Sequence, residues 1–251
     1  MTLDSPLPPL PANRRVFRAE RRIRLSDTTA TGRLRLDAVA RYLQDIATDD
    51  VDDAGTDDSE HVWVVRRTVL DVLHPFDRDS SVVLATWASG VGPRWATRRT
   101  RLEGNAGGCI EAESLWVHLH RDTMQLHPMP ERFWEVFGAA GLPRVSGRLL
   151  LSAEVPVETE RSSWPVRVTD IDIMGHVNNA VYWGAIEAIP AAVLPTYRAV
   201  LEYRDPIDLH SRVTLAVERG SDALNVWFLN RGHVAAVATA GPHSSALIRT
   251  S

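Results

Sequence analysis

The chain has 251 residues, of which 44% are hydrophobic, so it can bury one large core or two smaller ones. Its formal net charge of -4 lacks the basic excess that a general nucleic-acid binder needs to neutralise phosphates. No apolar run approaches the roughly 18 residues of a spanning helix, so we expect a folded cytoplasmic protein with neither a membrane span nor a nucleic-acid partner.

The amino-terminal segment and the cysteine content support this placement. Residues 1–13 contain four prolines and lack the basic and apolar regions of a signal peptide, which predicts a disordered lead. Cys109 is the only cysteine, so an internal disulfide cannot form and a reducing compartment is expected. Nothing near Cys109 in the sequence would activate its thiol, and we interpret it as a core or turn residue.

The first half of the chain reads as a strand, a turn, one long helix and then several strands. Residues 18–25 lead into the polar segment at 27–32, after which apolar residues recur at helical spacing: Leu34, Leu36, Val39, Tyr42, Leu43 and Ile46. Strands are expected at residues 63–72, 81–88, 94–102 and 109–118, with a turn at 104–108.

A connecting segment and a second, similar half follow. Residues 123–163 contain prolines around a short predicted helix near residues 131–138. Further strands are expected at residues 199–204, 212–218, 223–229 and 234–240. One helix for each curved antiparallel sheet suggests an α+β tandem hotdog. Its first unit would span residues 14–140, and its second would span residues 141–251.

A spaced motif relates the two halves. The pattern R-x2-D-x4-G occurs at residues 24–32 and again at residues 167–175, an offset of 143. At the same offset, Gln44 of the first predicted helix corresponds to Glu187 of the second. The chain therefore contains an internal repeat.

A second pattern shows where the halves differ in length. P-x-D-x2-S-x-V begins at residue 75 and again at residue 206, an offset of only 131. The difference between the offsets, 143 − 131 = 12, indicates about a dozen extra residues in the first half. Residues 49–60 include seven acids and are the natural candidate, which we interpret as an exposed acidic loop, with a lid or docking role as the alternative.

The functional signal lies in residues 168–190, where acids, a histidine and two asparagines precede an apolar helix that Pro190 should close. Residues 166–168 alternate like the end of a strand, so the polar cluster should occupy a strand-to-helix turn. There, Asp172 and His176 can converge on one reacting centre, and free N–H groups at the helix start can polarise a carbonyl. Such a turn suits acyl transfer.

The roles of these residues follow from their chemistry. Asp172 would activate water or attack the carbonyl carbon directly, while His176 would orient the water or protonate the leaving group. Asn178 and Asn179 are candidates for positioning the carbonyl or the water, with helix capping as the alternative for each. A divalent metal on Asp170, Asp172 and His176 is a competing interpretation, but no other histidine pair has ligand spacing. We therefore expect no metal and no cofactor.

Three stretches resemble the acyl-acyl-carrier-protein (acyl-ACP) thioesterases, particularly their bacterial members. They are SDTTATGRLRLDAVARYLQDIATDDVDDAG, the region from VWVVRRTVLDV to RWATRRTRLEGNAGGCIEAESLWV, and DIDIMGHVNNAVYW. The last stretch also fits the motif of single-hotdog acyl-CoA thioesterases. The resemblance implies hydrolysis of fatty acyl-ACP to free fatty acid, as in fatty acid biosynthesis. An acyl-CoA thioesterase and a non-catalytic acyl-binding hotdog are the alternatives.

The resemblance also assigns residues. The catalytic aspartate and histidine of the family correspond to Asp172 and His176. Plant-type members place a catalytic asparagine between the two, where this chain has Met174. They also have a functional glutamate shortly after a Leu-Glu-Tyr-Arg segment; residues 201–204 match that segment, but Pro206 occupies the position of the glutamate.

Acyl binding would then belong to the first half, where aromatic residues are candidates for lining a tunnel, with core packing as the alternative: Tyr42, Trp63, Trp87, Trp95 and Trp116. Three arginines are candidates for steering an acidic carrier protein: Arg98, Arg99 and Arg101. Because one chain carries both hotdogs, the repeat predicts a monomeric pseudo-dimer, with a homodimer as the alternative.

Overall fold

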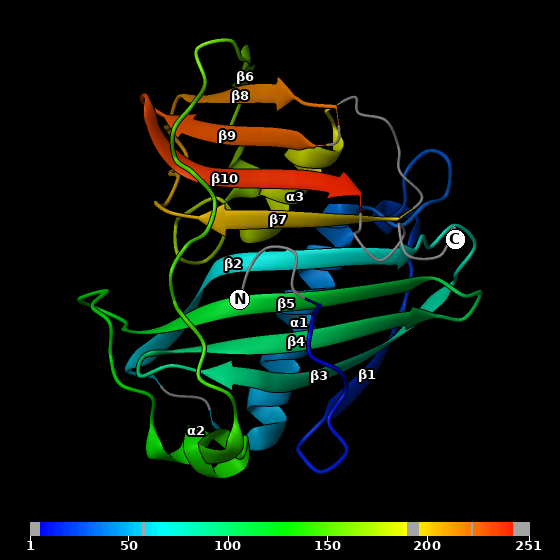
Figure 1. Ribbon diagram of the computed structural model, residues 1–251, viewed down its shortest axis with the longest axis vertical. Coiled ribbons are helices and arrows are strands. Elements are labelled where there is room, and N and C mark those ends of the chain that lie inside the picture. Colours follow the sequence, from blue (N-terminus) through cyan, green and yellow to red (C-terminus); the bar gives the residue numbers. More distant parts are fainter. Residues whose placement is uncertain (1–5, 57–58, 190–195, 222, 243–251) are drawn as a thin grey trace.

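The structure is a computed structural model that describes residues 6–56, 59–189, 196–221 and 223–242. Across these ranges, ten strands form one continuous antiparallel sheet in the order β1-β3-β4-β5-β2-β7-β10-β9-β8-β6. The helices α1 (Leu36–Ala54) and α3 (Asn179–Glu187) pack against each other and cover one face of this sheet (Figure 1).

The predicted tandem hotdog is confirmed. The first half contributes β1 (Phe17–Arg22), β2 (His61–His74), β3 (Ser81–Val91), β4 (Trp95–Gly104) and β5 (Cys109–His120). The second half contributes β6 (Glu160–Trp164), β7 (Tyr197–Tyr203), β8 (Val213–Arg219), β9 (Leu224–Asn230) and β10 (His233–Pro242). Period-two alternation and turn residues located these strands well, and most differ from their predicted bounds by one to three residues.

The two halves join through their central strands. β2 pairs with β7 in antiparallel register, from Arg67 opposite Glu202 to Val72 opposite Tyr197. One apolar core lies between the helices and the sheet and draws on both halves; its buried members include Val39, Ile46, Leu84, Trp183 and Phe228. The halves therefore behave as one packed unit and not as separate modules.

The strand expected at residues 166–168 is wrong. β6 ends at Trp164, Pro165 follows it, and Val168–Asp170 form a 3₁₀ turn that matches a 3₁₀ turn at Leu25–Asp27 in the first half. Proline has no N–H to continue a ladder, and Asp170 closes the turn by accepting the backbone N–H of Arg167 at 2.8 Å. Pro190, predicted to close the second helix, lies outside the described residues, and α3 ends at Glu187.

The acidic segment at residues 49–60 is only partly the loop that its composition predicted. Helix α1 continues through it to Ala54 and is capped by Gly55 in the left-handed region, at φ 60°. The reason is Asp50, which is 1% exposed and pairs with Arg15 and Arg98 from other elements. Residues 57–58 lie outside the described residues. The extra length of the first half is therefore mostly helix, since α1 has 19 residues and α3 has 9.

The connecting segment crosses the face of the sheet that the long helices leave open (Figure 1). It begins with the predicted short helix, α2 (Glu131–Val136), which packs near the end of α1. Farther along, the backbone N–H groups of Leu150 and Leu151 donate to the buried carboxylate of Glu202, at 2.6 and 3.0 Å. On the same face, the Pro8 carbonyl in the predicted lead accepts a hydrogen bond from Arg99; residues 1–5 lie outside the described residues.

Candidate active site

The turn between β6 and α3 brings Asp172 and His176 together. The backbone N–H of Asp172 donates to the His176 carbonyl at 2.8 Å, and the N–H of Gly175 donates back to the Asp172 carbonyl at 3.0 Å. Gly175 has φ 78°, a conformation that favours glycine. The N–H of Val177 then donates to the Ile207 carbonyl at 2.8 Å, which anchors the turn to the chain before β8. Asp172 and His176 thus stand at the two ends of one closed turn.

The side chain of Asp172 is half-buried and only partly engaged. Its Oδ1 accepts the backbone N–H of Met174 at 2.9 Å, so the residue at the plant-type asparagine position orients the carboxylate through its main chain. Its Oδ2 has no hydrogen-bond donor within the described residues. Burial, and then the negative charge of the nearby Asp172 carboxylate, raises the pKa of the buried Tyr182 hydroxyl. One carboxylate oxygen is therefore free to act on water or on a carbonyl.

His176 has an acidic neighbour that the sequence analysis missed. Its Nε2 lies 3.7 Å from Oδ1 of Asp208, and the two residues also form an isolated antiparallel bridge. Both side chains reach solvent, at 37% and 71% exposure. Asp208 lies in the repeated pattern at residues 206–213, and no motif in the chain indicates that this pattern folds beside His176. Asp208 can orient the imidazole.

The two asparagines have different surroundings. Asn178 is the N-cap of α3, and its Oδ1 accepts the N–H of Ala180 at 2.9 Å, so the capping role left open by the sequence is observed. Asn179 is the first residue of α3, and its carboxamide makes no hydrogen bond within the described part of the chain. Its carboxamide therefore remains available to a ligand.

Gln44 of α1 is a further site residue, supplied by the other half. Its Nε2 donates to Oδ1 of Asn178 at 3.3 Å. Reciprocally, Oε2 of Glu187 on α3 accepts the backbone N–H of Leu36 at the start of α1, at 3.0 Å. Each helix thus reaches the amino-terminal end of the other, as expected of a pseudo-twofold pair. The match of Gln44 with Glu187 in the repeat was the sequence signal for this contact.

The corresponding turn of the first half has the same backbone hydrogen bonds but different side chains. Thr29 N–H donates to the Arg33 carbonyl at 2.7 Å, and Gly32 N–H donates to the Thr29 carbonyl at 2.9 Å. Leu34 N–H donates to the Phe76 carbonyl at 3.0 Å. This bond corresponds to the one from Val177 N–H to the Ile207 carbonyl in the second half. At the predicted offset of 143, threonine and arginine stand where the second half has Asp172 and His176. This turn lacks the acid–histidine pair.

Asp27 holds the first-half turn together. Its carboxylate accepts the backbone N–H of Arg24 at 3.0 Å, the Tyr42 hydroxyl at 2.7 Å and the Arg41 guanidinium at 3.1 Å. Burial raises its pKa, but the hydrogen bonds from Tyr42, Arg24 and Arg41 outweigh burial and hold the pKa below its ordinary value. Asp170 accepts a backbone N–H in the same manner.

The candidate metal ligands of the turn and the thiol of Cys109 have the following surroundings. Among the described residues, no group of three or more His, Cys, Asp or Glu side chains is placed to hold a metal ion. The carboxylates of Asp170 and Asp172 bind backbone N–H groups instead. Burial raises the pKa of the Cys109 thiol, which keeps it in the less reactive protonated form.

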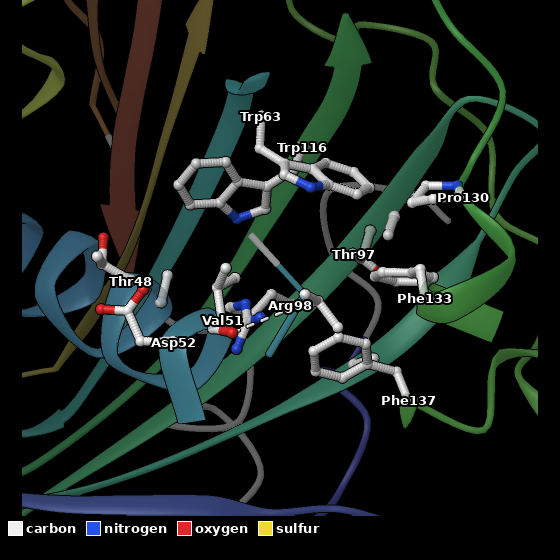
Figure 2. A pocket seen from close by; sticks show the side chains of 14 residues that line it. Thr48, Val51, Asp52, Trp63, Thr97, Arg98, Trp116, Pro130, Phe133 and Phe137 are labelled. Carbon is white, nitrogen blue, oxygen red and sulfur yellow. Dashed lines mark hydrogen bonds between the residues drawn. The ribbon is translucent and has the colours of Figure 1, made fainter. Parts of the chain in front are cut away.

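A cavity of about 340 Å³ lies in the first half between the end of α1, the inner face of the sheet and α2. Figure 2 shows the indole rings of Trp63 and Trp116 along one wall, with Phe133 of α2 and Phe137, which follows α2, farther round. Thr48, Val51 and Asp52 of α1 and Arg98 of β4 complete the lining. The cavity is therefore mostly apolar with a charged margin.

The other aromatic candidates lie elsewhere. Trp87 packs beneath the guanidinium of Arg99, which is 5.6 Å from its ring, on the face of the sheet away from the cavity. Trp95 donates from Nε1 to the Val145 carbonyl at 2.9 Å, beneath the connecting segment. Tyr42 is buried in the core and bonded to Asp27. Of the aromatic candidates, Trp63 and Trp116 therefore line the cavity.

Of the three arginines expected to steer a carrier protein, two are largely buried, so that prediction is wrong for Arg98 and Arg99. Arg98 turns inward to Asp50, at 2.5 Å. Arg99 is fully buried and pairs with Glu111. Arg101 pairs with Glu111 at 3.0 Å. Alternation along β4, which is covered on both faces, takes Arg98 and Arg99 largely out of solvent, whereas Arg101 stays 40% exposed.

Sequence profiles identify both halves. The acyl-ACP thioesterase N-terminal domain matches residues 14–137, and the acyl-ACP thioesterase C-terminal domain matches residues 154–238. The chain belongs to the acyl-ACP thioesterase family. As a member of this family it is a thioester hydrolase, and the repeat described above corresponds to the family's two domains.

Relatives and solved structures agree with this assignment. An uncharacterised protein of Mycobacterium tuberculosis is 32% identical over 247 residues, covering 94% of this thioesterase and 96% of its own length. A chloroplastic acyl-[acyl-carrier-protein] hydrolase of Cuphea viscosissima is 26% identical over 212 residues, covering 75% of this chain and 52% of its own.

Two solved structures share the fold. The 12:0-ACP thioesterase from Umbellularia californica superposes with a TM-score of 0.74 at 20% identity, covering 90% of this chain and 96% of its own. An acyl-ACP thioesterase from Bacteroides thetaiotaomicron gives 0.74 at 16% identity, covering 90% and 97%. Within the described residues of this thioesterase, no helix is both long and apolar enough to cross a membrane.

Proposed function

We propose that this thioesterase hydrolyses fatty acyl-ACP to free fatty acid and carrier protein, with Asp172 and His176 as its catalytic pair. The observation that carries the proposal is the closed turn that holds both residues at the start of α3. The first-half turn has the same backbone with threonine and arginine at these positions, so the chemistry belongs to the second half.

The free Oδ2 of Asp172 acts as the general base that takes a proton from water, and the resulting hydroxide attacks the thioester carbonyl carbon. The carboxamide of Asn179 stabilises the negative charge on the carbonyl oxygen. The intermediate then collapses, the C–S bond breaks, and His176 gives a proton to the departing thiolate. Asp208, 3.7 Å from Nε2 of His176, orients the imidazole for that transfer.

The acyl chain occupies the first-half cavity. Gln44 contacts the catalytic turn through Asn178, and the cavity begins one helical turn farther along α1, at Ala47 and Thr48. The extension of α1 beyond Gln44 supplies this wall. Helix α3 ends at Glu187, the counterpart of Gln44, so within the described residues the second half has no helical extension of this kind.

The two-domain chain also bears on which acyl carrier the enzyme prefers and on its oligomeric state. We expect acyl carrier protein to be preferred over coenzyme A, since the family profiles span both halves of the chain. One chain supplies the catalytic turn, Gln44 and the cavity, so a monomer contains every part of the site. The single cysteine and its raised pKa fit the reducing cytoplasm that the sequence predicts.

A matrix of hydrolysis rates tests the function. Acyl groups from octanoyl to oleoyl are presented to the purified enzyme on carrier protein and on coenzyme A, with Asp172→Asn as the inactive reference. The expected result is turnover on carrier protein that depends on chain length. Rates at the Asp172→Asn background for every substrate, with or without acyl binding, would contradict the proposal.

A further inference from the structure

Arg98 places a charged donor group in the wall of an otherwise largely apolar cavity. Its Nη1 donates to Asp50 at 2.5 Å and to the Thr86 hydroxyl at 3.3 Å. Its Nε and Nη2 N–H groups have no acceptor within the described residues, although the side chain is only 13% exposed. The Phe137 ring, 5.7 Å from the guanidinium, blocks one approach of solvent. These N–H groups therefore face the cavity unpaired.

A second donor in the same cavity wall is also unpaired. Nε1 of Trp116 is buried and has no hydrogen-bond acceptor in the part of the chain that the structure describes. Buried N–H groups are normally paired, and a plain hydrocarbon chain would displace water from the free Arg98 N–H groups without replacing its hydrogen bonds. Unpaired N–H donors would not stabilise the binding of a plain hydrocarbon chain in this cavity.

We propose that the cavity binds an acyl chain carrying a hydroxyl or carbonyl oxygen, and that Arg98 recognises this oxygen. The inference rests on the proposed function, because it assumes that the cavity holds the acyl group. An acceptor oxygen would pair with the free N–H groups of Arg98 in a charge-assisted hydrogen bond. Arg98 is thus a specificity residue.

A neutral oxygen fits this site better than a carboxylate. Asp50 accepts from both Arg15 and Arg98 and already balances part of their charge. Asp52 lines the same cavity, so a second carboxylate on the ligand would meet an acid of like sign. A hydroxyl or carbonyl oxygen accepts the hydrogen bond without that repulsion.

The position of the oxygen along the acyl chain follows from helix geometry. Gln44 marks the catalytic end of α1, and Asp50, the partner of Arg98, lies six residues farther along the helix. At 1.5 Å per residue this is a rise of about 9 Å. The recognised oxygen therefore lies in the distal part of a medium-length chain and not beside the thioester.

The test compares kcat/KM for carrier-protein thioesters of equal length: decanoyl, decanoyl with a terminal hydroxyl, and decanoyl with the hydroxyl beside the thioester. The wild-type enzyme should favour the terminal hydroxyl over plain decanoyl by at least tenfold. Arg98→Met keeps the apolar stem and removes the donors, so it should abolish the preference. Asp50 retains Arg15 in this variant, and a melting temperature verifies folding. Arg101→Met, on the opposite face of β4, is the matched control and should keep the preference.

Equal wild-type rates on plain and terminally hydroxylated chains would overturn the inference, as would a preference that survives in Arg98→Met. If no thioester is hydrolysed, the proposed function fails, and calorimetry of the free acids still decides the inference. Decanoic acid with a terminal hydroxyl should then bind the wild type at least tenfold tighter than decanoic acid does, and Arg98→Met should not discriminate between them. Equal binding to the wild type would sink the inference by itself.

Discussion

Asp172 and Asp27 lie in the two copies of the repeated turn, at positions that do not correspond, and we expect them to have different roles. Asp172→Asn keeps the acceptor for the Met174 N–H, so we expect a change in unfolding free energy within about 1 kcal/mol. Loss of the base should lower kcat at least a hundredfold.

Asp27→Asn weakens bonds to Tyr42 and Arg41 and should destabilise the protein by about 2 kcal/mol while kcat stays near wild type. Urea unfolding and single-turnover hydrolysis measure both, and a fully active Asp172→Asn enzyme would contradict the assignment.

The contribution of Asp27 to stability should depend on pH. Its pKa in the folded protein lies below the ordinary value of 3.8, so its stabilising effect is fully present above that value and is lost as the pH falls through the folded pKa. Burial raises the pKa of Glu113 and of Glu187, which act in the opposite direction but are common to both proteins. The difference in unfolding free energy between wild type and Asp27→Asn should therefore shrink below about pH 4. A constant difference from pH 7 to pH 3 would refute this.

At the scale of elements, the two glycine turns form a natural matched pair. Gly175 and Gly32 have φ 78° and 85°, and a Cβ at either would meet no atom closer than 3.7 Å, so alanine costs mainly backbone strain. We expect Gly175→Ala and Gly32→Ala each to lose about 1 kcal/mol of stability. Only Gly175→Ala should lower kcat strongly, because it moves Asp172 and His176. Equal effects on kcat would argue against a single catalytic turn.

The extension of α1 depends on one buried acid. Asp50→Asn leaves Arg15 and Arg98 without their shared carboxylate and should destabilise the protein by about 3 kcal/mol. The control, Asp53→Asn, removes a carboxylate that is 54% exposed and also binds Arg15, and it should cost less than about 1 kcal/mol. Thermal unfolding followed by circular dichroism distinguishes them. Equal losses would mean that the buried pairing does not hold the helix.

Sequence patterns predicted the elements that depend on residues close together in the chain. They missed those that depend on residues far apart in the chain. Strands and the two long helices follow from alternation, helical periodicity and turn residues, which act within a few positions. The end of α1 depends on Arg15 and Arg98, which lie far from Asp50 along the chain, so its acidic composition pointed to a loop instead. The same reasoning explains the candidate site. Asp172, His176 and the asparagines share one segment, whereas Gln44 and Asp208 reach it only through tertiary structure.

At the scale of the whole molecule, the chain carries both halves of a pseudo-dimer. We expect the rate per enzyme molecule to be constant on dilution from micromolar to nanomolar concentration, because the cavity, Gln44 and the catalytic turn belong to one chain. Sedimentation at the same concentrations reports the assembly state. A fall in specific activity that tracks dissociation of a homodimer would show that a second chain completes the site.

The β2–β7 junction has a consequence for how the protein is made. During synthesis, β2 emerges more than a hundred residues before β7, its partner across the middle of the sheet. At typical ribosomal rates the edge of β2 stays unpaired for on the order of ten seconds, with its N–H and C=O groups open to other chains. A nascent first half therefore presents an aggregation-prone edge until the second half closes it. Overproduction of the first half alone should yield insoluble protein, and supplying the second half in the same cell should rescue it.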